Sequence, residues 1–128
     1  MTAVLADYYR AFSTLEIQAI LPYFHEPCLM ESLQGVFAAP TYAELEAAFT
    51  PAIEGLRARE YGRSELSLRH FKSLSATAAL AIGVAIRYKL DGAELERVGV
   101  TYVLHKAGTH WKIAVLIIHD PEEVVQPV

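Results

Sequence analysis

The sequence predicts an α+β fold in which three N-terminal helices pack on a curved, mainly antiparallel sheet. Two observations carry this prediction. Apolar residues recur at helical spacing as far as Leu56, and from Gly62 onward the period of the pattern changes to two, which is typical of strands. The 128 residues suit one domain, and we assign residues 1–128 to it.

The first helix is expected over residues 2–13, because four large apolar side chains share one face there. These are Leu5, Tyr8, Tyr9 and Phe12. The tetrapeptide "STLE", residues 13–16, matches a capping box and predicts a short second helix. Pro22 should limit that helix, because a proline inside a helix removes a hydrogen bond and clashes with the preceding turn.

A strand and a third helix are expected next. The stretch "LPYFHEPCLMES" reads as an elbow, with "PCLMES" forming a short strand. "TYAE" at 41–44 is a second capping box. Pro51 should kink the third helix or restart it with Thr50 as a new cap. The apolar stripe of this helix consists of Tyr42, Leu45, Phe49, Ile53 and Leu56.

Four strands are expected over 64–73, 76–90, 94–106 and 110–119. "DG" at 91–92 is the clearest turn between them. A two-residue loop there would place Arg87 opposite Glu96 and Lys89 opposite Glu94, which gives two pairs of opposite charge. The "HKAGTH" turn at 105–110 fits either a two-residue loop or a bulged one.

Both faces of this sheet are apolar, although an antiparallel sheet with one solvated face should alternate. Three helices can cover only one of them. We take the face with Tyr88, Arg97 and Thr101 as the inward one. The other face, which carries Val98, Val100 and Tyr102, is predicted to meet the same surface of a second subunit in a homodimer. The outward face is assigned by the small and β-branched residues that pave it.

Composition excludes several classes of partner. A formal charge of -4 and a pI near 5.7 supply no basic field, so no nucleic-acid or anionic-membrane partner is expected. The one cysteine, Cys28, cannot form an internal disulfide, which favours a reducing compartment. No apolar run reaches the about 18 residues of a membrane helix, and no signal sequence precedes the first helix. These observations predict a cytoplasmic protein.

The five histidines predict no metal site and no cofactor, because none are spaced as i and i+4 on a helix or as H-x-H. His119 closes the last expected strand and is a candidate acid or base, since histidine titrates near neutral pH. In the bulged register it would lie beside Arg97. The alternative is a histidine at the rim of the sheet that bonds to nearby backbone.

The order of elements, with "YFHEPCLMES" and the tryptophan of "HWKIAVLIIHD", resembles the nuclear transport factor 2-like superfamily, also called SnoaL-like or ketosteroid-isomerase-like proteins. The resemblance covers essentially the whole chain. It implies a cone-shaped, cystatin-like roll in which a curved sheet wraps a long helix and leaves a mostly apolar pocket at the open end. Members include isomerases, dehydratases, cyclases and non-enzymes, so the resemblance implies a fold and not a reaction.

The first 35 residues are similar to bacterial ketosteroid isomerase, from "MTAVLADYY" to "CLMESLQG". By this resemblance Tyr8 matches the oxyanion-hole tyrosine, Ser32 the basic aspartate and Thr101 the protonated aspartate. A serine hydroxyl cannot abstract a proton from carbon as a carboxylate does. Glu31 would take over only if its strand is bulged, because neighbouring side chains on a strand point to opposite faces.

Two functions remain open. The first is a pocket protein for a small apolar, oxygen-bearing metabolite, with acid–base isomerisation, dehydration or cyclisation as candidate reactions. The candidate catalytic residues are Tyr8, Ser32, Glu31 and His119, and the candidate ligand contacts are Tyr8, Tyr88, Arg97 and Thr101. The second is a non-enzymatic dimerisation or accessory module with a filled pocket, in which Tyr8 is a core aromatic. A pocket of about 300 Å³ or more would favour the first.

Overall fold

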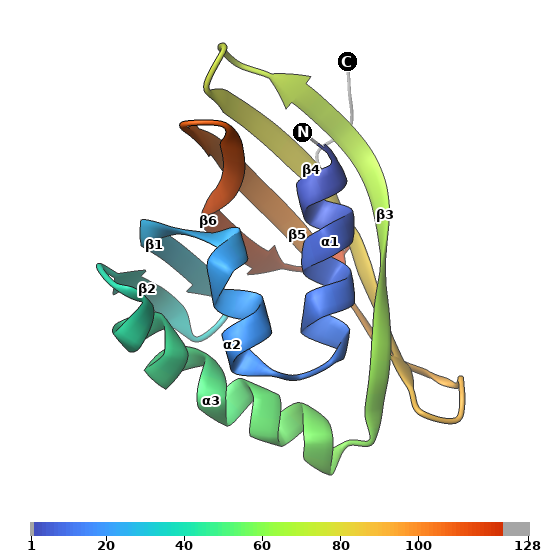
Figure 1. Ribbon diagram of the computed structural model, residues 1–128. Coiled ribbons are helices and arrows are strands. Elements are labelled where there is room, and N and C mark those ends of the chain that lie inside the picture. The colour runs from blue at the N-terminus through green and yellow to red at the C-terminus, as the bar shows by residue number, and fades with distance from the viewer. Residues whose placement is uncertain (1, 122–128) are drawn as a thin grey trace.

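The computed structural model describes residues 2–121 and confirms the α+β fold (Figure 1). Residue 1 and residues 122–128, which the predicted domain also included, lie outside the described residues. The helical elements are α1 (Thr2–Ser13), α2 (Ile17–Ile20), the 3-10 turn η1 (Leu21–Tyr23) and α3 (Tyr42–Ala58). The strands are β1 (Phe24–Ser32), β2 (Gly35–Ala39), β3 (Tyr61–Ser73), β4 (Ala78–Lys89), β5 (Glu94–Ala107) and β6 (His110–His119).

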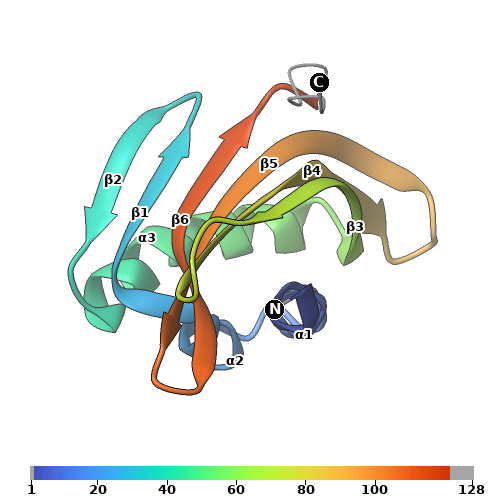
Figure 2. The same ribbon diagram turned by 90° about the horizontal axis from the view of Figure 1, so that it is seen from above.

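The strands form one six-stranded sheet in the order β2-β1-β6-β5-β4-β3. β1 and β6 are parallel, and the other neighbours are antiparallel. The sheet curves around the helices (Figure 2). α1 lies against the concave side next to β3, and α3 contacts both β2 and β3. Within residues 2–121 no helix is long and apolar enough to cross a membrane.

The predicted capping box at residues 13–16 is wrong. Ser13 is the last residue of α1, and its hydroxyl donates to the Tyr9 carbonyl at 2.8 Å. α2 begins after Glu16, whose side chain makes no capping bond. Thr14 accepts the backbone N–H of Glu16 at 3.1 Å instead. The hydroxyl of Ser13 therefore bonds to a carbonyl in the preceding turn of α1 and does not cap α2.

α3 is capped from a distant strand. The backbone N–H of Tyr42 donates to Oε2 of Glu26 in β1 at 2.8 Å, whereas Thr41 makes no side-chain capping bond. The second predicted capping box is therefore wrong as well. α3 runs through Pro51 without restarting, and Thr50 donates to the Glu46 carbonyl at 2.8 Å. The predicted stripe is confirmed at the buried positions Leu45, Phe49, Ile53 and Leu56.

The four long strands occupy the predicted regions, and β2 is an addition that the sequence pattern did not predict. β2 is exposed except at Ala39, so no alternation marks it. At the turn between β4 and β5, Arg87 does lie opposite Glu96. The register then shifts and puts Tyr88 opposite Glu94, so the predicted pairing of Lys89 with Glu94 is wrong.

The last turn is the two-residue alternative. Ala107 pairs with His110, and Gly108 has a φ of 64°. A register shift lies further along, between Val103 and Leu104, and it brings His119 opposite Gly99. His119 is therefore not paired with Arg97.

The assignment of the two sheet faces was inverted. The side chains that pack with α1 in the main core come from the face predicted to be outward. They are Ala79, Ala81, Ala85, Val100, Tyr102 and Leu104. Ile82 and Val84 belong to a separate cluster on the convex face. The physical reason is size, because small residues on β4 leave room for the four large side chains of α1, and periodicity does not report size.

β3 bends closely over β4 at Gly83. A Cβ atom added to this glycine would lie 2.5 Å from the Ser67 carbonyl oxygen and 3.2 Å from Leu68 Cα, both of which are backbone. β3 also shifts register between Leu68 and His70, where it faces this part of β4. Glycine is therefore needed for the close approach of the two strands.

Replacing Gly83 with Ala should lower the free energy of unfolding by about 1–3 kcal/mol, the usual cost of overpacking. Gly55→Ala is the matched control, because a Cβ atom there meets nothing within 4 Å and the site is helical. That change should raise stability by up to about 1 kcal/mol. Urea unfolding of both variants measures the difference. Equal effects of the two substitutions would contradict the packing at Gly83.

Candidate functional site

A cavity of about 760 Å³ lies between α1, α3 and the concave face of the sheet. Its wall is mostly apolar, and the polar groups are hydroxyls, two guanidinium groups, the carboxylate of Glu31 and the amide of Gln34. The apolar lining includes Phe12, Met30, Phe37, Val100, Leu116 and Ile118. The polar lining includes Tyr8, Tyr9, Ser32, Arg59, Ser64, Arg87 and Tyr102.

The space exists because α3 presents small residues to it. Ala48, Ala52 and Gly55 line the cavity, and their spacing of four and three residues places them on one helix face. Buried Phe49 and Leu56 flank them and anchor the same helix in the core. An added Cβ atom at Gly55 would meet nothing within 4 Å. Bulky residues at these positions would fill the cone.

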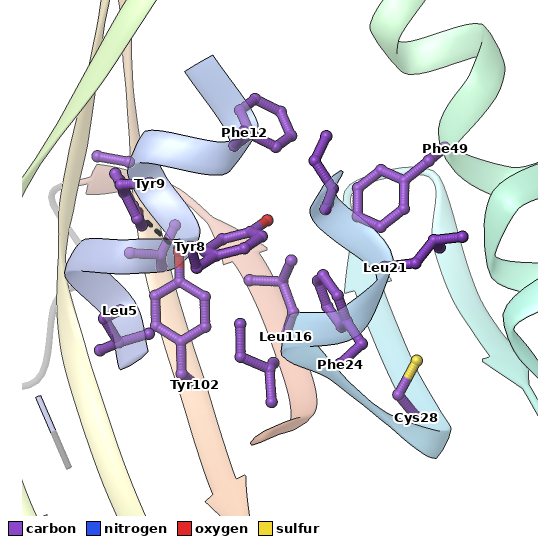
Figure 3. Packing of buried hydrophobic residues seen from close by; sticks show 14 of the residues in the cluster. Leu5, Tyr8, Tyr9, Phe12, Leu21, Phe24, Cys28, Phe49, Tyr102 and Leu116 are labelled. Carbon is purple, nitrogen blue, oxygen red and sulfur yellow. Dashed lines mark hydrogen bonds between the residues drawn. The ribbon is translucent and has the colours of Figure 1, made fainter. Parts of the chain in front are cut away.

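Tyr8 joins the core to the cavity. The residue is only 4% exposed, and its ring packs edge-on against Phe24 and Tyr9, with ring centroids at 5.4 Å and 5.6 Å. In Figure 3 its hydroxyl points away from the bonded pair of Tyr9 and Tyr102 and toward the side of α3. Within residues 2–121 this hydroxyl makes no hydrogen bond. Burial raises the pKa of Tyr8 far above its usual value, so the phenol remains a hydrogen-bond donor at neutral pH.

Tyr9 and Tyr102 supply a second donor. Their hydroxyl oxygens are 2.7 Å apart, so one hydroxyl donates to the other and one proton of the pair is left for another acceptor. Burial raises the pKa of Tyr9 to about 12, against a smaller lowering by the bond to Tyr102. The pKa of Tyr102 is raised first by burial and then by Tyr9 and Tyr8. Both groups therefore stay protonated at neutral pH.

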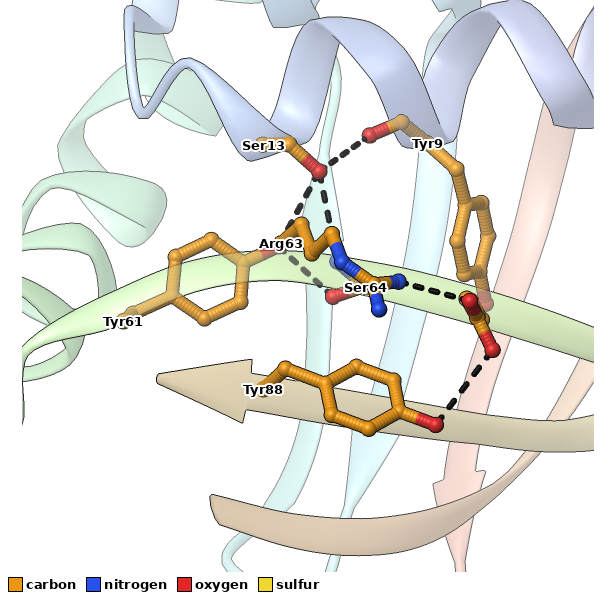
Figure 4. A network of polar contacts seen from close by, with 7 residues as sticks. Tyr9, Ser13, Tyr61, Arg63, Ser64 and Tyr88 are labelled. Carbon is orange, nitrogen blue, oxygen red and sulfur yellow. Dashed lines mark hydrogen bonds and ion pairs between the residues drawn. The ribbon is translucent and has the colours of Figure 1, made fainter. Parts of the chain in front are cut away.

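A network of hydroxyls fixes α1 on β3 beside the cavity (Figure 4). The oxygens of Tyr61 and Ser64 are 2.6 Å apart, and the Ser64 backbone N–H donates to the Ser13 hydroxyl at 3.3 Å. Ser13 in turn donates to the Tyr9 carbonyl. These hydrogen bonds link Tyr9 in α1, which lines the cavity, to Ser64 in β3, which also lines it.

Two arginines share one carboxylate at the cavity wall. Arg87 in β4 donates from Nη1 to Oε1 of Glu96 in β5 at 3.0 Å. Arg59, which follows α3, donates to the same oxygen at 3.0 Å. The Arg87 side chain is 19% exposed. Its charge opposes the burial effect on the pKa of Tyr8, so the two groups are electrostatically coupled. The sequence pattern does not identify Arg87 as a site residue, because it predicts that the face carrying Arg87 is the outer one.

Tyr8, Ser32 and Glu31 are the predicted site residues that line the cavity. Ser32 accepts the backbone N–H of Gln34 at 3.2 Å. Glu31 pairs with Val36 and Ile117 in an unshifted part of β1, and the register shift of this strand lies before Leu29. Glu31 and Ser32 therefore occupy opposite faces, so the bulge that would bring Glu31 to the position of Ser32 is not there.

Tyr88 and Arg97 were predicted to contact a ligand, but neither lines the cavity. The guanidinium carbon of Arg63 lies 4.2 Å from the centre of the Tyr88 ring. Arg97 donates from two nitrogens to Glu94, at 3.0 Å and 2.9 Å. Both positions belong to the face opposite the core, so the inverted assignment of the faces explains the error.

Thr101 and His119 also lie away from the cavity. The Thr101 hydroxyl is 2.9 Å from Nε2 of His119, and Nδ1 of the same ring is 3.0 Å from the Asp120 carbonyl oxygen. A carbonyl can only accept, so Nδ1–H donates to it and Nε2 of the neutral ring accepts from Thr101. This contact matches the predicted alternative of a rim histidine bonded to backbone. The match of Thr101 to a pocket aspartate is wrong, because Thr101 faces the convex side.

Metal-ligand groups do not gather in the part of the chain that the structure describes, where no cluster of three His, Cys, Asp or Glu could hold an ion. Cys28 is buried and free. Burial, with a smaller effect of Glu26, raises the pKa of its thiol to about 11. The thiol is therefore protonated and unreactive at neutral pH.

Solved structures of similar shape support the fold. An NTF-2 like protein of unknown function from Shewanella oneidensis has a TM-score of 0.74 at 19% identity, over 93% of this chain and 95% of the other. A ketosteroid isomerase-like protein from Erwinia carotovora has a TM-score of 0.68 at 16% identity, over 98% and 94%. A proposed calcium/calmodulin-dependent protein kinase type II association domain from Thiobacillus denitrificans has a TM-score of 0.76 at 12% identity, over 93% and 93%.

These identities are low, so the solved structures establish the shared fold alone. No curated protein matches the sequence. A family model described as NTF2-like protein (DUF6841) matches residues 1–121. The resemblance to the nuclear transport factor 2-like superfamily is thereby confirmed, and because the match spans nearly the whole chain, the protein belongs to the NTF2-like family DUF6841.

Proposed function

We propose that the protein binds a small apolar molecule with oxygen acceptors in the cavity between α1, α3 and the sheet. The volume of about 760 Å³ supports this proposal, because pockets for small molecules commonly span about 300–1,000 Å³. The alternative of a filled cone is disfavoured by the small residues of α3. The binding of a ligand would bury the apolar wall that is otherwise left in contact with water.

The hydroxyl of Tyr8 is the observation that carries the proposal. It is a protonated donor, it lies at the cavity wall, and it has no acceptor among the described residues. A hydrogen-bonding group in a mostly apolar setting stabilises a partner that can accept from it. Tyr9 and Tyr102 offer a further proton nearby. A ligand carbonyl, ether or carboxylate oxygen fits this arrangement.

Acid–base turnover, as an isomerase, dehydratase or cyclase, is a further part of the proposal. One neighbour by fold is described as ketosteroid isomerase-like. Tyr8 would stabilise negative charge on a ligand oxygen, as an oxyanion-hole tyrosine does. Among the described lining residues Glu31 brings the one carboxylate, and strand pairing directs it to the opposite face from Ser32. The geometry therefore favours binding over proton abstraction.

We also propose a homodimer, now formed through the true convex face. That face carries an apolar stripe on the middle strands, made of Leu80, Ile82, Val84, Ile86, Val103, Val115 and Ile117. Ile82 and Val84 are already buried within one chain, and a second copy would cover the five other residues, which are partly exposed, with the same surface. Two neighbours by fold are described as association domains, which agrees with assembly through a shared surface.

Narrowing the cavity should weaken binding. Ala48→Leu places three more carbon atoms against the lining, and affinity for 2-acetylnaphthalene, a neutral ketone, should fall about tenfold or more, given the usual cost of overpacking. Ala47→Leu is the matched control, because Ala47 lies next along the same helix, is exposed and does not line the cavity. Isothermal titration calorimetry measures both. Equal losses in the two variants would place the probe elsewhere.

Tyr8→Phe should weaken binding of 2-acetylnaphthalene by about 1–3 kcal/mol, because the ketone oxygen loses its donor. The free energy of unfolding should change by less than about 0.5 kcal/mol, since the ring stays and the hydroxyl has no partner among residues 2–121. Tyr102→Phe is the comparison. It breaks the bond to Tyr9 and should cost about 0.5–1.5 kcal/mol of stability. A loss confined to stability in Tyr8→Phe would remove Tyr8 from the site.

Val103→Glu should convert a dimer into a monomer, because Val103 pairs with Leu80 and Val115 in the middle of the convex face and a charge there would be buried. Leu33→Glu is the control, since Leu33 is 92% exposed in the turn after β1. Light scattering at micromolar concentration reports the mass. A wild-type monomer under these conditions would refute the dimer.

A further inference from the structure

We infer that the ligand of the cavity is an amphipathic monocarboxylate, whose carboxylate binds Arg87 and Arg59 and whose apolar body lies along the wall toward Met30 and Phe37. This inference rests on the proposed function, since it names the chemical class that the same cavity would take. It is supported by the positive charge of Arg87 and Arg59 and by the hydrogen-bond donors that these arginines and Tyr8 bring to the cavity wall.

The first argument is a charge balance. Arg87 and Arg59 both line the cavity, and both donate to the same oxygen of Glu96. One carboxylate therefore balances one of two guanidinium groups, and one positive charge is left. Arg87 is the more buried of the two, at 19% exposure against 49% for the Arg59 side chain. A poorly hydrated cation facing an apolar space favours an anionic partner.

The second argument concerns hydrogen-bond donors. A guanidinium group has five N–H donors, and within residues 2–121 the side chain of Arg87 uses one of them, toward Glu96. Arg59 likewise uses one. The phenol of Tyr8 adds another unused donor. The wall is therefore rich in donors, and a carboxylate, which only accepts, can satisfy several of them at once.

Other charged groups limit the choice of anion. Glu31 also borders the cavity, but its pairing with Ile117 puts it on the face opposite Met30 and Ser32. Its charge and that of Glu96 would oppose a second negative charge on a ligand. The single uncompensated positive charge thus suits a monoanion better than a dianionic phosphate. The remaining lining is apolar, which suits an aromatic or aliphatic body.

A matched pair of probes tests the inference. 2-Naphthoate and 2-acetylnaphthalene share one ring system and differ by a carboxylate oxygen in place of a methyl group. With the wild-type chain, calorimetry should show that the carboxylate binds about tenfold or more tightly than the ketone, as expected for hydrogen bonds to charged groups. Equal affinity of the two probes would overturn the carboxylate assignment and leave the proposed function intact. Failure of both probes to bind would count against the proposed function itself.

Variants that remove the charge of either arginine test whether the carboxylate of the probe binds there. Arg87→Gln and Arg59→Gln should each weaken 2-naphthoate binding about tenfold and leave the ketone within about twofold. Arg97→Gln is the matched control, because it removes the same charge from the convex face of the same sheet. An equal loss of 2-naphthoate affinity in Arg97→Gln would show a long-range charge effect and overturn the assignment.

Glu96→Gln separates binding from a structural role. Removing this carboxylate frees both guanidinium groups, so 2-naphthoate should bind more tightly, by about threefold or more, whereas the ketone should be unaffected. If Glu96 only holds the fold together, both probes would lose affinity, and the inference would be wrong. Arg59 is half-exposed, so Arg59→Gln and Glu96→Gln still decide the outcome if Arg87→Gln fails to fold.

Discussion

The packing of large α1 side chains on small residues of β4 is the constraint on which the rest of the structure depends. Leu5, Tyr8, Tyr9 and Phe12 share one core with Ala79, Ala81 and Ala85, and Gly83 lets β3 bend over the same strand. This fit decides which face of a sheet that is apolar on both sides becomes concave. The side chains of β4 and β5 that reach the cavity follow from that decision, because strand neighbours alternate between faces.

The cavity is open because several residues of α3 that face it are small. α3 fixes itself to the core with Phe49 and Leu56, while its small residues Ala48 and Gly55 leave space next to them. α1 and the sheet together supply polar groups around this space, with the phenol of Tyr8 from α1, the phenol of Tyr102 from β5 and the guanidinium group of Arg87 from β4. The proposed preference for ligands that accept hydrogen bonds rests on these donors in a mostly apolar wall.

The shared fold does not determine which reaction, if any, the protein catalyses. Individual residues in the cavity reduce the number of candidate reactions. Scaffolds of this kind carry unrelated functions, so the site and not the family must support an activity. Ser32 lines the cavity where the resemblance to ketosteroid isomerase would place a basic carboxylate, and Glu31 lies on the other face of β1. Tyr8, which the same resemblance matches to the oxyanion-hole tyrosine, lines the cavity. The cavity therefore contains a phenol donor at Tyr8 and a hydroxyl at Ser32, where the resemblance would place a carboxylate.

The sequence by itself determined the helices, the long strands and their order, because these depend on local periodicity and on turn residues such as Gly92 and Gly108. It also pointed to Tyr8 at the cavity. Only the tertiary structure decided the helix cap that Glu26 provides to Tyr42, the exposed edge strand β2, and the choice of Arg87 over Arg97 as the inward cation. A cap from a distant strand leaves no local pattern. The choice between two apolar faces depends on the volumes of side chains that meet across the core, which the period of a sequence does not contain.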